Sequence, residues 1–144
     1  DVPAYIPQQP VGLAGELACL NATDDEISTI RGYYETMVQT NDSPNTVEFF
    51  KTDMAFHESI VQASRNLPLI KTHKQYNSRL WRARYMSSRS RLGRINTMRD
   101  HAEMLAGLEA RDGARIAAVM REHLTAAIIN VTKIKTEESQ IQKS

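Results

Sequence analysis

Several features are scarce in this chain of 144 residues, and each scarcity excludes a class of protein. Cys19 is the only cysteine, so no intramolecular disulfide and no thiolate metal site can form, and a reducing, cytoplasmic location is expected. Six glycines and five prolines are too few for a turn-rich β-sandwich. No apolar run approaches the roughly 20 residues of a membrane-spanning helix, and no signal-peptide pattern opens the chain.

The charge balance is also close to even, with a formal net charge of +1. Such a balance gives no general reason to expect direct binding to nucleic acid. Hydrophobic residues make up 41% of the chain and charged residues 24%, which is typical of a globular domain rather than a disordered segment. The first residue is Asp1 rather than Met, so we expect that a further part of the protein precedes this chain.

Apolar residues recur with helical spacing almost without a break from Leu13 to Ile134. Thr23 and Glu26 form a capping box that predicts a helix start, and Pro44 suits the first turn of the next helix. Asn66 is expected to end that helix in a left-handed conformation. No alternating strand pattern occurs. The sequence therefore predicts an all-α fold, an antiparallel bundle of about six helices.

The two ends of the chain differ in composition from this helical part. Residues 1–12 contain Pro3, Pro7 and Pro10 and are predicted to form an extended leader, because proline lacks the amide donor of a regular helix. Residues 13–136 form the predicted domain. Residues 137–144 are predicted to be a polar tail that frays.

Three of the four histidines and one aspartate fall on the apolar sides of their predicted helices. Asp53 and His57 lie four residues apart and so project from the same helix face. His101 and His123 each replace an apolar residue in the stripe of a later helix. A single inward histidine is usually a hydrogen-bonded core residue, but three that obey the same rule favour a shared divalent metal ion. His73, the fourth, is predicted to lie at the surface, and Trp81 is predicted to be a core residue.

Four features of the chain occur in an order that resembles a known family. They are Asp53-Met-Ala-Phe56-His57, then Asn66, then Asp100-His101, and finally Met120-Arg-Glu-His123-Leu124. This order resembles the FCD domain, the C-terminal effector-binding module of FadR-type regulators in the GntR family of bacterial transcription factors. The segment from Ala106 to Ala114 is similar to the helix–turn–helix junction of that family.

The resemblance implies a central metal or effector cavity inside the bundle, a function, and a set of residues that bind the metal. One divalent metal ion per chain, commonly zinc or nickel, would be bound by Asp53, His57, His101 and His123, and a small organic acid would complete its coordination. The resemblance also implies a homodimer, no enzymatic activity, and contact with DNA only through a winged-helix domain that this chain does not contain. No contact with a membrane is expected.

An anionic effector requires a cation in the cavity wall. Arg79 is the first candidate for effector binding, because family members often carry an arginine on this helix, and Arg82 is the second. A solvent-exposed arginine on an amphipathic helix is the alternative interpretation of Arg79. The chain departs from the family near Pro7 and Val11, where an arginine and a glutamate are usual.

Two other functions fit a helical bundle with buried histidines. One is a hydrolase-like metalloenzyme, but the chain contains neither the Glu-x-x-His pairs of di-iron bundles nor a His-Asp dipeptide. The other is a purely structural interaction bundle in which the histidines are ordinary core residues.

Overall fold

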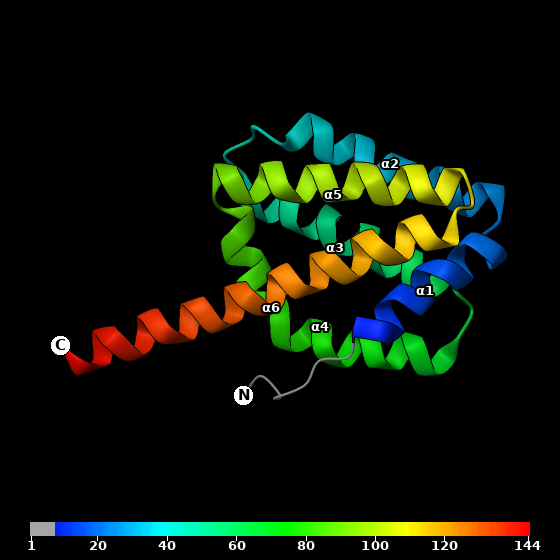
Figure 1. Ribbon diagram of the computed structural model, residues 1–144. Coiled ribbons are helices and arrows are strands. Elements are labelled where there is room, and N and C mark those ends of the chain that lie inside the picture. Colours follow the sequence, from blue (N-terminus) through cyan, green and yellow to red (C-terminus); the bar gives the residue numbers. More distant parts are fainter. Residues whose placement is uncertain (1–7) are drawn as a thin grey trace.

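The computed structural model describes residues 8–144, which form six α-helices and contain no β-strand. In chain order the helices are α1 (Gln8–Asn21), α2 (Asp24–Thr40), α3 (Thr46–Ala63), α4 (Leu67–Ser88), α5 (Arg91–Glu109) and α6 (Gly113–Lys143). The predicted all-α bundle is therefore confirmed. Helices α2 and α5 lie side by side along one edge of the bundle, α4 lies along the opposite edge, and α6 crosses between them and packs on α1 (Figure 1).

Short polar side chains begin most of these helices. The capping box at the start of α2 is confirmed, since the Glu26 amide donates to Thr23 Oγ1 at 3.1 Å and the Thr23 amide donates to Glu26 Oε1 at 2.9 Å. Asn66 corrects the sequence prediction. It does not end α3 but begins α4, with its Oδ1 accepting from the Leu69 amide, and Arg65 is the residue with a positive φ of 55°. The polar amide of asparagine serves either end of a helix, so its sequence position alone was ambiguous.

Both ends of the described chain are more helical than the sequence predicts. Residues 8–12 belong to α1 rather than to an extended leader, because Pro10 lies in the first turn, where backbone amides need no helical partner. Pro3 and Pro7 lie outside the described residues. At the other end, α6 continues to Lys143 instead of fraying, and its last turns project beyond the bundle (Figure 1). An ion pair between Arg82 and Glu138 joins this extension to α4.

Helix α3 carries nine buried residues and lies in the interior of the bundle, where it supplies much of the core. Phe49, Phe56 and Ile60 of this helix are fully buried and pack in one cluster with Leu108 and Ile116. Full burial of each such side chain contributes about 1.5–3 kcal/mol to stability relative to leaving it exposed. The helix that provides Asp53 and His57 is therefore anchored by apolar packing along its buried face, while Lys51, Glu58 and Gln62 are exposed.

Two side chains lie elsewhere than the sequence predicts. His73 is buried, with 6% of its surface exposed, rather than at the surface. Trp81 is 45% exposed rather than in the core, and its ring packs perpendicular to that of Phe50, with centroids 4.9 Å apart. Both residues lie on α4. The buried face of this helix, which includes His73, is rotated by part of a turn from the face that looks apolar in the sequence, which includes Trp81.

Candidate metal centre

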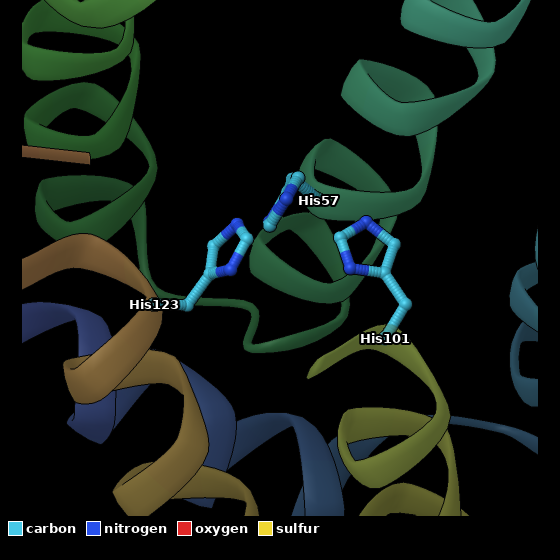
Figure 2. A group of neighbouring side chains, drawn as sticks. All are labelled: His57, His101 and His123. Carbon is cyan, nitrogen blue, oxygen red and sulfur yellow. The ribbon is translucent and has the colours of Figure 1, made fainter. Parts of the chain in front are cut away.

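Three helices bring the predicted histidines together inside the bundle. His57 projects from α3, His101 from α5 and His123 from α6, and their rings face one another (Figure 2). One nitrogen of each ring lies within 4.8 Å of those of the other two, which is close enough for the three to bind one metal ion. His57 and His101 are buried, and His123 is partly buried. These residues are far apart in the sequence, and they meet because α5 packs on α6 while α3, α5 and α6 all pack against α1 and α4.

The contact between α5 and α6 depends on a small residue near their common turn. A Cβ atom built on Gly107 would lie only 3.2 Å from the Ile116 backbone nitrogen, so a larger side chain would push the two helices apart. The Gly107 carbonyl also accepts from the Asp112 amide at 2.8 Å. Gly107 therefore allows the close approach that sets the separation of His101 and His123 further along these helices.

The rings of the cluster are fixed by stacking. The His57 and His123 rings are nearly parallel, with centroids 5.0 Å apart and an angle of 26°, whereas the His57 and His101 rings are perpendicular at 4.7 Å. Phe56 lies almost parallel to His101, with centroids 4.2 Å apart. Since Phe56 is fully buried, it fixes the plane of the His101 ring.

Asp53 contacts two of the three rings. Its Oδ1 lies 2.7 Å from His101 Nε2 in a hydrogen bond, and 3.2 Å from His57 Nε2 in a contact too poorly aligned to be one. Among the described residues, His57 Nε2 and His101 Nδ1 are buried without any hydrogen-bond partner. An unsatisfied buried nitrogen costs free energy, so nitrogens directed at a shared space beside a carboxylate fit a divalent ion. Imidazole and carboxylate donors are those that zinc and nickel accept.

The protonation states of these groups also suit a metal ion. Burial lowers the pKa of His57 well below its ordinary value, and burial likewise lowers the pKa of His123. Burial alone would raise the pKa of Asp53, but its contacts with His101 and His57 hold it well below the usual range. At neutral pH the site therefore presents neutral imidazoles at His57 and His123 together with a carboxylate, the forms that bind metals.

Asp100, which the sequence analysis did not name as a candidate site residue, lies against the cluster. Its Oδ2 lies 2.8 Å from His123 Nδ1 and accepts a hydrogen bond from the Nδ1–H group. The proton therefore stays on Nδ1, and Nε2 is left as the nitrogen with a free lone pair. Burial would raise the pKa of Asp100, but the hydrogen bond with His123 and the charge of that ring lower it overall. The signal in the sequence is its place directly before His101, on the side of α5 that turns toward α6.

A cavity of about 140 Å³ opens beside the cluster. Asp53, Asp100, His123 and Arg84 are among its lining residues. Arg84 is 8% exposed, its Nη1 donates to Asn77 Oδ1 at 2.7 Å, and its Nε has no partner among the described residues. Burial lowers the pKa of Arg84, which the neighbouring Asp53 partly offsets. Arginine nevertheless remains protonated, so the cavity contains a buried cation.

The two arginines predicted to bind the effector lie elsewhere. Arg79 is exposed, and Arg82 is 70% exposed in its ion pair with Glu138; neither lines this cavity. Arg84 continues the stripe of His73, Asn77 and Leu80 along α4, which is largely polar in the sequence and is buried only through the packing of the helices.

The fold and the cluster together define a helical bundle with three histidines in its interior that lie close enough to bind one metal ion. The FCD domain family matches residues 12–126, most of the chain and close to the predicted domain of 13–136. The chain therefore belongs to the FCD family, the effector-binding regulatory domains of GntR-type transcription factors. No curated protein matches the sequence. None of the helices in residues 8–144 has the length and apolarity that crossing a membrane would require.

Proposed function

We propose that this chain senses a small organic acid at a divalent metal ion, zinc or nickel, held by Asp53, His57, His101 and His123. The observation that carries the proposal is the meeting of three imidazole nitrogens within 4.8 Å of one another beside a buried carboxylate. A divalent ion with these four ligands keeps one or two open positions, which a carboxylate can occupy. No enzymatic reaction is proposed, because sensing regulators are what this family contains.

The charges around the cavity favour an anion. A divalent ion contributes two positive charges and Arg84 one, while Asp53 and Asp100 contribute one negative charge each. The sum is +1, and burying a net charge is unfavourable until an ion of opposite sign enters. The guanidinium of Arg84 can bind a carboxylate through two parallel hydrogen bonds, and it replaces Arg79 and Arg82 as the proposed anchor.

The size and polarity of the cavity restrict which organic acids can bind. A volume of about 140 Å³ holds four or five water molecules at about 30 Å³ each, so the acid has only a few carbon atoms. Ser87, Asn96, Thr97 and Asn130 line the same cavity and offer hydrogen bonds to hydroxyl groups. A small hydroxy acid is therefore the proposed effector. Its binding would regulate a winged-helix DNA-binding domain preceding this chain in a homodimeric regulator, an arrangement that suits two DNA half-sites.

Metal content after purification tests the first part of the proposal. We expect about one zinc or nickel ion per chain, and we expect the double variant His101→Ala, His123→Ala to contain none. The matched control is His73→Gln, which removes the fourth histidine and should leave the metal content unchanged. A double variant with a full complement of metal would show that these residues are not the ligands.

A thermal-shift screen of glycolate, lactate and larger acids tests the second part. An acid at 100 times its dissociation constant should stabilise metal-loaded protein by about 2.7 kcal/mol and have little effect after chelation. Arg84→Gln should remove most of this shift relative to its own unliganded baseline, whereas Arg79→Gln should retain it. Equal shifts with and without metal, or a full shift in Arg84→Gln, would contradict the proposed mode of binding.

Sedimentation of the chain at micromolar concentration tests the proposed homodimer. We expect a dimer, and a species that stays monomeric across the concentration range would show that this chain lacks sufficient contacts of its own.

A further inference from the structure

A second and larger cavity lies between α3 and α4, away from the histidine cluster. Its volume is about 420 Å³, within the range of small-molecule sites and well above the roughly 140 Å³ of the cavity at the cluster. Val61 and Ile70 form apolar parts of its wall, while His73, Asn77 and Trp81 contribute polar and aromatic groups. We call it the α3–α4 groove. None of the residues proposed to bind metal lines it.

His73 is the buried polar side chain of this groove that has no hydrogen-bond partner among residues 8–144. It is 6% exposed, and its ring is held perpendicular to Tyr76 with centroids 5.2 Å apart. Among residues 8–144 no side chain or backbone group forms a hydrogen bond with either ring nitrogen. Burial, with a smaller contribution from the charge of Arg84, lowers its pKa to about 4. At neutral pH the ring therefore offers one donor and one acceptor nitrogen to a molecule in the groove.

Asn77 cannot supply the same recognition, because its side chain is already occupied. Its Oδ1 accepts from Arg84 Nη1 at 2.7 Å, and its Nδ2 contacts the sulfur of Met54 at 3.8 Å. Asn77 thus lines the groove while its hydrogen bond reaches Arg84, which lines the other cavity. Of the two buried polar side chains in the groove, only His73 therefore has unsatisfied hydrogen-bonding capacity.

Trp81 provides a flat apolar surface in the same groove. The indole is 45% exposed, and its perpendicular packing on Phe50 holds it in place. A partly exposed, immobilised indole in a concave site favours stacking with another planar ring. Glu58 and Lys74 also line the groove, and their charges cancel, so the groove does not select for either sign. The combination favours a neutral ligand with a flat apolar body and one hydrogen-bonding edge.

We propose that the α3–α4 groove binds a small, neutral heteroaromatic compound that stacks on Trp81 and forms a hydrogen bond with His73. This site is separate from the metal centre and does not depend on it. The compound differs in class from the small anion proposed for the metal centre. The chain would accordingly receive two chemically distinct signals, on opposite sides of the Asn77–Arg84 hydrogen bond.

Calorimetry on the full chain, with nicotinamide and adenine as planar probes, tests this proposal. The saturated amide cyclohexanecarboxamide is the control for shape and hydrogen bonding without aromaticity. We expect the better planar probe to bind at least tenfold more tightly than the saturated amide. Because Trp81 is the only tryptophan, its fluorescence reports the location directly, with free N-acetyltryptophanamide as the control for collisional quenching.

Variants separate recognition from stability. Trp81→Leu and His73→Phe should each weaken binding of the planar probe about tenfold, while Met86→Ala, at another exposed apolar position of α4, should not change it. Trp81 is half-exposed, so Trp81→Leu remains informative even if His73→Phe does not fold. Chelation should leave the affinity unchanged, which distinguishes this site from the metal centre. Equal affinity for planar and saturated probes, or unaltered affinity in Trp81→Leu, would overturn the proposal.

Discussion

Histidine is buried in two parts of this molecule, and the two environments differ in what surrounds the ring. His57, His101 and His123 lie beside two carboxylates, Asp53 and Asp100, at 2.7–3.2 Å. His73 is equally buried but has no carboxylate and no hydrogen bond within the described chain. Burial lowers the pKa of His57, His123 and His73 alike.

The comparison separates the effect of burial from that of neighbouring charge. Burial is enough to make an imidazole neutral, because it penalises the charged form. A cation is favoured only where carboxylates offset its charge and where several ring nitrogens meet. The cluster satisfies both conditions, and His73 satisfies neither. The same residue type therefore fits the metal binding that we propose in one place and the recognition of a neutral molecule that we propose in the other.

The largest expected effect comes from replacing Phe56, the aromatic ring beside the histidine cluster. Phe56→Ala and Phe49→Ala should each lower the free energy of unfolding by about 3–5 kcal/mol, since both rings are fully buried. Only Phe56→Ala should also weaken metal binding, because Phe56 stacks on His101 whereas Phe49 packs under the guanidinium of Arg94. Urea denaturation and metal titration measure the two effects. The corresponding Leu variants are the milder pair, and equal losses of metal affinity in both would contradict the assigned role of Phe56.

The next largest effect is the contribution of His73 to the pH dependence of the free energy of unfolding. Its pKa falls from 6.5 in the unfolded chain to about 4 in the folded chain, so the unfolded state binds a proton first as the pH drops. Stability is therefore fully present above about pH 6.5 and is lost as the pH falls toward 4. Between pH 7 and pH 5 the loss due to His73 is about 2 kcal/mol. We expect urea denaturation at pH 7 and pH 5 to show that the free energy of unfolding of His73→Phe decreases by about 2 kcal/mol less than that of the unaltered protein.

His57 and His123 act in the same direction and are retained in this variant, so a pH dependence remains. An unchanged decrease in His73→Phe would show that His73 is protonated equally in both states.

The smallest expected effect concerns the carboxylate that orients His123. Asp100→Asn removes the charge that fixes the Nδ1 proton, and the metal affinity should fall about tenfold. Glu103→Gln is the matched control, because Glu103 lies on the same helix but pairs with Arg115 at the surface. Competition with a chromophoric chelator measures both affinities. Equal affinities in the two variants would show that Asp100 does not orient the ring.

The location of the cluster could be predicted from the sequence because it depends on local periodicity. Asp53 and His57 occupy one face of a helix whatever surrounds it, and His101 and His123 interrupt apolar stripes that must face the interior. The capping box at Thr23 is equally local, and it is present in the structure. These features need only the geometry of a single helix.

Other features depend on how the helices meet. Trp81 and His73 lie on neighbouring faces of α4, and only the direction of α3 decides that the larger apolar ring is half-exposed and the histidine buried. The same packing places Arg84, rather than Arg79, in the cavity wall. Helix α6 extends to Lys143 because polar residues with good helix propensity need no buried face.

The sequence by itself therefore determined the helical class, the capped start of α2 and the inward placement of the three clustered histidines, since each follows from the local geometry of one helix. The tertiary structure alone decided which arginine reaches the cavity, which carboxylate orients His123, and where a second groove opens. These depend on the angles and separations between helices, which arise from close packing of side chains distant in the sequence.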